Sequence, residues 1–249
     1  MDISVVATTS DRISAWRELY RSEMSCQIIH DSIHGRPGWT QEYLLSVGDT
    51  AVGYGSVAVA GPWKEKPTIY EFYVDPMQRQ RMFDLFERFL EVSSARELSV
   101  QSNDVLATTM LHTYVPHASS GAILFHDKLV TSLAPDGARY REATASETPD
   151  DSPQDRKWRG VVDVDGQAAA SGGVMFHYNR PYGDIYMEVA EPFRRRGLGS
   201  YIVQELKRLC YENGFIPAAR CSTGNVASRR TLQKAGFVPC GHILGGQVR

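Results

Sequence analysis

The sequence is poor in cysteine and has no long apolar segment, and both absences exclude classes of protein. Its four cysteines form no CxxC pair, which is typical of reduced cysteines in a cytosolic protein; they are Cys26, Cys210, Cys221 and Cys240. No apolar run approaches the roughly 18 residues that a membrane-spanning helix needs. The start of the chain lacks a basic segment followed by an apolar one, so no signal peptide is expected. We therefore predict a cytoplasmic protein.

The chain also has little net charge and no clustered metal ligands. A formal net charge of −2 gives no general attraction to nucleic acid or to an anionic membrane, so neither is an expected partner. His30 and His34 are four residues apart, but no third ligand is near them, so no metal is expected. What remains is a 249-residue chain, 42% hydrophobic, with room for one large domain or two small ones. The oligomeric state is not predicted.

The most informative segment joins a predicted strand to a predicted helix near the C-terminus. The strand covers 184–189, the turn reads Arg-Arg-Arg-Gly-Leu-Gly at 194–199, and the helix starts near Ser200. Its apolar residues follow a 3.6-residue period, at Ile202, Val203, Leu206, Leu209 and Cys210. The first amides of a helix have no internal acceptor, and two glycines allow close approach of an anion. The turn thus predicts a pyrophosphate site, with a solvated basic loop as the alternative.

The elements that follow this turn repeat the same order. A strand is predicted at 216–222, and Asn225 opens a second helix that runs to Ala235. Gly236 ends that helix, and Phe237 starts a further strand. The basic turn at 194–199 differs from two other phosphate-binding motifs. It lacks the Lys-Ser/Thr ending of a nucleotide-triphosphate loop and is not Gly-x-Gly-x-x-Gly.

Together these residues resemble the GNAT superfamily of acyl-CoA-dependent N-acyltransferases over roughly residues 158–243. The family signature Arg/Gln-x-x-Gly-x-Gly/Ala falls on Arg194, Gly197 and Gly199, and the family Asn and its small partner fall on Asn225 and Ser228. The resemblance implies acetyl-CoA as cosubstrate. It also implies coenzyme contacts from Met187, Val189, Arg194, Arg195, Arg196, Gly197, Leu198, Gly199, Ser200, Asn225 and Ser228. Leu232 stands where many members carry a tyrosine that protonates the departing thiolate.

The N-terminal half contains a second copy of this order of elements. When Val74 is aligned with Val189, Arg79 falls on Arg194, but Met82 and Asp84 fall on the two glycines of the turn. A methionine side chain and an added negative charge oppose a pyrophosphate at this place. We therefore predict a degenerate GNAT-like module, as in the class of tandem GNAT proteins. Coincidence between two strand-helix-strand segments is the alternative.

The predicted fold class is α/β (α+β), with two GNAT-like modules that each have a mixed, mostly antiparallel twisted sheet flanked by helices. The predicted domains are 1–130, the degenerate module, and 131–249, the module with the coenzyme site. Further predicted elements are helices at 13–24 and 26–34, hairpins at 43–60 and 161–176, a strand at 122–125 and a polar linker at 143–157. The second module is too short for the family's N-terminal helix pair, so the first module is expected to wall its acceptor pocket.

The expected reaction is transfer of an acetyl group to a primary amine of a small molecule or peptide by direct attack. An alkylammonium must first lose a proton, which costs roughly 4–5 kcal/mol at pH 7 for a lysine-like amine. Glu188 is the first candidate for the base, with Asp184 and Tyr186 behind it. A backbone amide near Val189 would stabilise the developing oxyanion. The alternative function is an acyl-CoA-binding sensor or scaffold without turnover.

Overall fold

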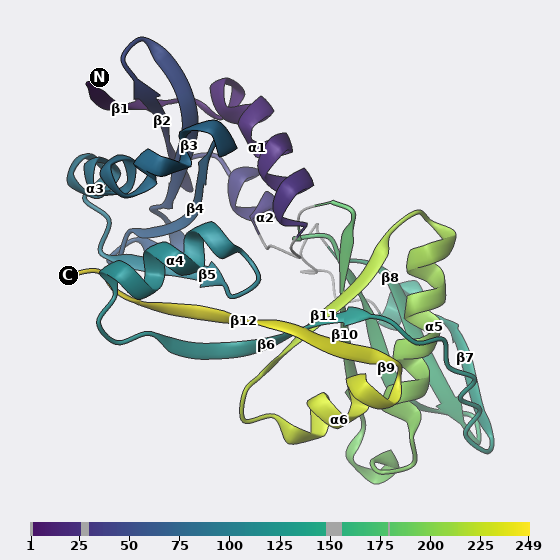
Figure 1. The fold of residues 1–249 in the computed structure, drawn as a ribbon. Helices are drawn as coiled ribbons and strands as arrows, with labels where there is room; N and C mark the ends of the chain where they lie inside the picture. Colours follow the sequence, from purple (N-terminus) through teal and green to yellow (C-terminus); the bar gives the residue numbers. More distant parts are fainter. Residues whose placement is uncertain (1, 26–29, 148–155, 179) are drawn as a thin grey trace. The chain divides into compact units, whose positions relative to one another are not determined.

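The protein is described by a computed structural model that covers residues 2–25, 30–147, 156–178 and 180–249. The chain forms two compact units. The N-terminal unit comprises Met1–Gly121 together with Gly241–Arg249, and the C-terminal unit comprises Ala122–Cys240. In both units, helices flank a mixed and mostly antiparallel sheet, as Figure 1 shows. The predicted fold class is confirmed.

The N-terminal unit carries the strand order β1-β2-β3-β4-β5-β12. Neighbouring strands in this sheet are antiparallel, except that β4 and β5 are parallel. Its elements are β1 (Ile3–Thr8), α1 (Ser10–Met24), α2 (Asp31–His34), β2 (Thr40–Val47), β3 (Thr50–Ala58), η1 (Gly61–Trp63), β4 (Thr68–Val74), η2 (Pro76–Arg81), α3 (Met82–Ser93), β5 (Glu97–Gln101), α4 (Val105–Tyr114) and the end of β12 (Phe237–Gln247).

The C-terminal unit carries the strand order β6-β11-β10-β9-β8-β7, in which β10 and β11 are parallel. Its elements are β6 (Ser119–Asp127), β7 (Ala138–Glu142), η3 (Ala145–Glu147), β8 (Arg156–Val164), β9 (Gln167–Met175), β10 (Tyr182–Val189), η4 (Glu191–Phe193), α5 (Leu198–Glu212), β11 (Ile216–Ser222) and α6 (Val226–Lys234). The predicted strand-turn-helix-strand-helix series is thus present. Gly236 has a positive φ at the end of α6, as predicted, and Gly214 has one just after the end of α5.

The apolar stripe of α5 places this helix on one face of the C-terminal sheet. Ile202, Val203, Leu206 and Cys210 are completely buried there. They share one hydrophobic cluster with Leu232 of α6 and with Ile185 of β10, so both helices pack on the same face. Burial of a leucine or isoleucine side chain contributes about 1.5–3 kcal/mol, so this cluster anchors the helix that follows the basic turn.

Several element boundaries differ from those expected. The chain passes from one unit to the other between Gly121 and Ala122, whereas the sequence analysis placed the limit after residue 130. The last strand starts in the C-terminal unit, but its residues Ile243–Gln247 pair with Gln101–Glu97 of β5 in the N-terminal unit. This pairing joins residues more than a hundred positions apart, which no local pattern in the sequence encodes.

Smaller differences concern helix starts and short strands. The helix predicted at 26–34 is helical over Asp31–His34, while 26–29, and with them Cys26, lie outside the described residues. Asp104 caps α4, because its carboxylate accepts a hydrogen bond from the amide of Ala107 at 3.0 Å. Strands β1 and β7 were not predicted. Of the polar linker 143–157, residues 148–155 lie outside the described residues, and β8 already begins at Arg156.

A buried carboxylate connects the helices of the N-terminal unit to its sheet. Glu71 of β4 is fully buried and accepts two hydrogen bonds from Arg17 of α1, each at 3.2 Å. His30 Nδ1 lies 2.8 Å from the same carboxylate, and the hydroxyl of Tyr54 donates to it at 2.9 Å. The Arg17 and His34 charges hold the pKa of Glu71 well below its usual value although burial opposes this. The His30/His34 spacing thus places both rings on one carboxylate.

His34 bridges Glu71 to a second buried carboxylate. Its Nε2 lies 3.0 Å from Glu71 and its Nδ1 lies 3.1 Å from Glu42. Since a carboxylate only accepts hydrogen bonds, these two contacts favour the imidazolium form of the ring, in which both nitrogens carry a proton. Burial alone lowers the pKa of His34, but the charge of Glu71 and the hydrogen bonds to Glu42 and Glu71 outweigh it and raise the pKa to about 9.

The stability of the N-terminal unit is expected to fall with alkaline pH because of His34. A histidine pKa that is higher in the folded than in the unfolded state gives stability that is complete below about pH 6.5 and is lost as pH rises through about 9. The expected loss is about 3 kcal/mol. Urea unfolding of wild type, His34→Gln and His112→Gln between pH 6.5 and 9.5 measures it. His112 is exposed on α4. His112→Gln should keep the wild-type dependence of the free energy of unfolding on pH, whereas His34→Gln should weaken it. An equal pH dependence in all three proteins would contradict the assignment.

Candidate functional site

The parallel strands β10 and β11 stay paired over a short distance only. Their register runs from Tyr182 opposite Ile216 to Asp184 opposite Ala218, and no pairing continues beyond it. Strand β10 nevertheless extends to Val189, paired with β9 on its other edge. The edge of β10 that faces β11 therefore has backbone groups between 185 and 189 without a strand partner. An extended ligand can pair with this edge.

The basic turn lies beyond the end of β10 and begins α5. Arg195 and Gly197 both have left-handed backbone conformations, with φ of 66° and 85°. The first helical hydrogen bond runs from the amide of Tyr201 to the carbonyl of Gly197, at 3.1 Å. The amides of Leu198, Gly199 and Ser200 consequently have no acceptor inside the helix, and the helix dipole adds positive potential there. This arrangement fits a phosphate group.

The side chains of this turn have different roles. Arg194 folds back, and its Nε donates a hydrogen bond to the carbonyl of Val189 at 3.1 Å. Arg195 and Arg196 are exposed, and the Arg196 guanidinium lies 5.7 Å from the centre of the Phe193 ring. The side chains of Leu198 and Ser200 are buried, so these two residues can offer a ligand only their backbone amides.

The second glycine of the turn is required by packing. A Cβ atom at Gly199 would lie 3.1 Å from the Cγ2 of Thr231 and 3.3 Å from the Cγ2 of Val189. A glycine therefore lets the first turn of α5 approach both α6 and β10 closely. Gly197, in contrast, needs its positive φ to turn the chain into the helix.

Lys234 is a basic residue at the turn that the sequence analysis missed. Its Nζ lies 3.4 Å from the position that a Cβ atom of Gly197 would take. Lys234 belongs to the last turn of α6, and it is exposed. The sequence signal is limited to a lysine at a helix end, so only the packing of α6 against α5 brings this ammonium to the glycine turn.

Asn225 and Ser228 lie at the start of α6. The Oδ1 of Asn225 accepts a hydrogen bond from the amide of Ser228 at 3.0 Å, so Asn225 is the cap of this helix. Asn225 is exposed, and Ser228 is half-buried. Both residues follow the end of β11, on the opposite side of the strand divergence from the basic turn.

The side chains of β10 alternate between the two faces of the sheet. Met187 and Val189 pack against the helix-side cluster, so their contribution to a ligand on the strand edge comes from the backbone. Asp184, Tyr186 and Glu188 lie on the opposite face. Glu188 is exposed and stands opposite Ser171 of β9. The carboxylate therefore faces away from α5 and α6 and is accessible from solvent.

A buried cluster of polar side chains surrounds Asp184, at the point where β10 and β11 diverge. Asp184 is 2% exposed, and its Oδ2 lies 2.7 Å from His177 Nε2 and 3.5 Å from Arg220 Nε. Tyr178 is also buried, and burial together with the Asp184 charge raises its pKa well above the usual value. Asp184 was a candidate from the sequence but its partners were not, because His177 and Arg220 belong to separate segments.

The N-terminal unit shares part of this geometry. The Nε of Arg79 donates to the carbonyl of Val74 at 3.1 Å, the same contact that Arg194 makes with Val189. Strands β4 and β5 also diverge, since only Thr68 and Ile69 pair with β5. However, η2 continues directly into α3, and Met82 has an ordinary helical φ of −63°. Met82 packs against the hydrophobic clusters, so no glycine turn with free amides forms here.

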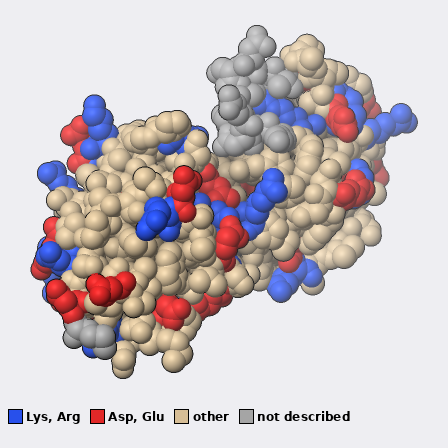
Figure 2. Space-filling view, turned by 90° about the horizontal axis from the view of Figure 1, so that it is seen from above, with Lys and Arg blue, Asp and Glu red and all other residues tan. Residues whose placement is uncertain are grey.

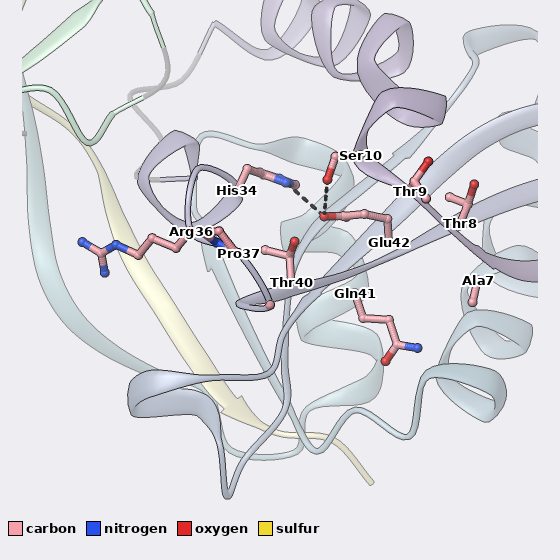
Figure 3. A pocket seen from close by; sticks show the side chains of 11 residues that line it. Ala7, Thr8, Thr9, Ser10, His34, Arg36, Pro37, Thr40, Gln41 and Glu42 are labelled. Atoms are coloured by element: carbon pink, nitrogen blue, oxygen red, sulfur yellow. Dashed lines mark hydrogen bonds and ion pairs between the residues drawn. The ribbon is translucent and has the colours of Figure 1, made fainter.

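A pocket of about 510 Å³ in the N-terminal unit has a polar floor formed by Ser10, His34 and Glu42 (Figure 3). These residue types occur in nucleophilic triads, but the contacts differ. Ser10 donates to Glu42 at 3.4 Å and not to His34, and both nitrogens of His34 face carboxylates. The histidine is therefore unable to accept the serine proton. These three residues therefore do not form a Ser-His-carboxylate triad.

The comparisons with known proteins agree with this geometry. A family model described as the acetyltransferase (GNAT) family matches residues 130–237. None of the curated proteins compared with the chain matches it. A GNAT-family acetyltransferase from Colwellia psychrerythraea has a TM-score of 0.72 at 13% identity, with 100% of both chains covered. A tandem GNAT protein from the clavulanic acid biosynthesis pathway has a TM-score of 0.65 at 14% identity, with 99% of this chain and 98% of that chain covered.

A GCN5-related N-acetyltransferase from Sphaerobacter thermophilus is a third similar structure, with a TM-score of 0.64 at 12% identity and coverage of 99% and 96%. Residues 130–237 therefore form a GNAT-family domain, and the chain as a whole has the fold of these structures, one of which is a tandem GNAT protein. This membership supports acyl transfer in general.

The charges, helices and metal-binding residue types of the described residues add three observations. Figure 2 shows acidic and basic side chains interspersed over the face in view. In the part of the chain that the structure describes, no helix is long and apolar enough to cross a membrane, and no group of three His, Cys, Asp or Glu side chains is arranged to hold a metal ion.

Leu232, at the position of the family tyrosine, is expected to tolerate substitution poorly. It is 1% exposed within the helix-side cluster. A tyrosine there adds volume and a hydroxyl to a packed core, which should cost about 1–3 kcal/mol. The exposed neighbour Arg230 provides the control, since Arg230→Tyr should change the free energy of unfolding by less than about 0.5 kcal/mol. Urea unfolding of both variants tests this; an unchanged midpoint for Leu232→Tyr would show that the ring finds space.

Proposed function

We propose that the C-terminal unit is an N-acetyltransferase that uses acetyl-CoA and acetylates a primary amine of a small molecule or peptide by direct attack. The observation that carries this proposal is the divergence of β10 and β11 after Asp184, with the glycine turn and its three free amides at the open end. A strand edge with unused backbone groups suits the amides of a pantetheine arm. A helix start with left-handed Gly197 suits a pyrophosphate.

The residues of the site would have the following roles in this reaction. The amides of 198–200, assisted by Arg195, Arg196 and Lys234, would bind the pyrophosphate. The backbone of 185–189 would orient the pantetheine arm, which carries the acyl group as a thioester. Asn225 would fix the start of α6 beside it. Glu188 would accept the proton of the incoming ammonium, directly or through a water molecule. Its exposed side chain is compatible with contact to an acceptor.

A second function, binding of acyl-CoA without turnover, is favoured by one observation. Leu232 replaces the tyrosine that protonates the thiolate in many family members, and it is part of the core. A protein without that acid can still bind the coenzyme. Release of free thiol in the presence of an amine panel separates the two functions, because only the enzyme produces it.

The coenzyme site is tested with two glycines that flank the same helix. Gly197 and Gly214 have φ of 85° and 75°, so an aspartate at either position carries similar backbone strain. Gly197→Asp also places a negative charge at the proposed phosphate site and should abolish acetyl-CoA binding. Gly214→Asp should bind as wild type does. Calorimetry gives affinity and stoichiometry, and 100-fold excess over Kd should stabilise the wild type by about 2.7 kcal/mol.

One coenzyme per chain is expected from this titration, because the N-terminal unit lacks the glycine turn. Two coenzymes per chain would refute a degenerate N-terminal unit. Absence of binding to the wild type would refute the proposed function itself.

The proposed base is tested by Glu188→Gln with Glu191→Gln as its control. Glu191 is also exposed, but it lies beyond the end of β10. Glu188→Gln should lower kcat by about 10²–10⁴-fold, the usual contribution of a general base, and leave the Kd of acetyl-CoA unchanged. Glu191→Gln should change neither quantity. Full activity of Glu188→Gln at neutral pH would remove Glu188 from the mechanism.

A further inference from the structure

Arg220 stands where the two parallel strands of the C-terminal unit begin to diverge. It lies on β11, two residues beyond Ala218, the last residue that pairs with β10. Its neighbours Ala219 and Cys221 are buried in the helix-side cluster. Because side chains alternate along a strand, Arg220 lies on the opposite face, together with Asp184 and Glu188. The guanidinium and the proposed base are thus on the same face of the sheet, on the two strands that separate.

Contacts with neighbouring side chains hold the Arg220 side chain in place. Its Nε is 3.5 Å from the buried carboxylate of Asp184, and its guanidinium carbon is 5.8 Å from the centre of the Tyr178 ring. Asp184 is in turn fixed by His177 at 2.7 Å. Asp184 and His177 are therefore positioning residues for the guanidinium. A flexible arginine would lose conformational entropy on binding a ligand, whereas this one is already oriented.

The end of the Arg220 guanidinium remains available. Its side chain is 31% exposed, and among the described residues Asp184 is its only ion-pair partner. Since Nε faces Asp184, the two terminal nitrogens keep their four N–H donors, which match the two oxygens of a carboxylate. A dianionic phosphate suits the site less well, because Asp184 and Glu188 both lie on this face and would repel a second negative charge.

We propose that the acceptor is an amine with a carboxylate beside it, that is an α-amino acid, and that Arg220 binds this carboxylate. The inference rests on the proposed acetyltransferase function. Glu188 lies four residues after Asp184 on β10. Arg220 lies two residues after Ala218, the residue of β11 that pairs with Asp184. At about 3.3 Å per residue, the two positions are offset by about 7 Å along the strands. With side-chain contacts from both ends, this offset suits an ammonium and a carboxylate that are a few ångströms apart.

The test uses amino acids and the amines that remain after their decarboxylation. Histidine and histamine, tyrosine and tyramine, tryptophan and tryptamine, and lysine and cadaverine differ by one carboxylate each. With the full chain and acetyl-CoA, kcat/KM is measured by thiol release and the product by mass. At least one amino acid should react at least 10-fold more efficiently than its amine. If every amine reacts as well as its parent amino acid, or no amino acid reacts although acetyl-CoA binds, the inference is overturned.

Variants of Arg220 test whether this residue causes the preference for an acceptor with a carboxylate. Arg220→Gln should raise the KM of the preferred amino acid by about 10–100-fold, with little change in its kcat, in the KM of the amines or in the Kd of acetyl-CoA; a charge-assisted bidentate contact is of this size. Arg220→Lys should restore part of the loss. Arg230→Gln, an exposed arginine on α6, is the control and should behave as wild type.

The outcomes separate this inference from the function on which it rests. If acetyl-CoA binds and amines are acetylated, but the preference for a carboxylate is absent or survives in Arg220→Gln, the inference fails and the acetyltransferase stands. If acetyl-CoA neither binds nor reacts with the wild type, both fall together. Should Arg220→Gln not fold, Arg220→Lys and the wild-type pairs still decide the question.

Discussion

The site of the C-terminal unit depends on the incomplete pairing of two parallel strands. β10 and β11 share a register only up to Asp184, so the rest of each strand keeps unused backbone groups along one edge. Each strand is followed by a helix whose first residues turn toward this opening: Gly197 starts α5 and Asn225 caps α6. The free amides, the basic turn and the polar cluster at Asp184 are all arranged around this divergence. If the strands paired along their whole length, these backbone groups would bond to each other and no ligand could pair with them.

In the N-terminal unit, β4 and β5 also diverge, but the protein's own residues fill the space between them. Every residue of β4 is buried, whereas β10 has half-buried residues and an exposed Glu188 near its end. Glu71 and its partners Arg17, His30 and His34 neutralise one another inside the unit. Such a network stabilises the fold only while it stays fully paired. The arginine contact to the strand-end carbonyl is kept in both units, so the scaffold persists where the glycine turn is lost.

Much of the C-terminal unit was predictable because its signals are local. A 3.6-residue apolar period places α5, left-handed Gly197 and Gly214 bracket it, and an asparagine opens α6 through its own hydrogen bond. Each of these depends on residues within about four positions, where backbone sterics and capping dominate. The fold class was implied by the family resemblance that these elements carry. The sequence does not predict which face Glu188 takes, because alternation fixes only which residues share a face, and packing fixes which face is covered.

The sequence by itself determined the helices, strands and turn around the basic segment, since their causes are steric and lie close in the chain. Tertiary structure alone decided which distant residues meet. Lys234 reaches Gly197, and Arg220 and His177 reach Asp184, only because α6 and β11 pack beside α5 and β10. It also placed Leu232 in the core and carried β12 from one unit to the other. Contacts over such separations depend on the packing of whole elements, and the free energy of that packing is spread over many residues, so no short motif records it.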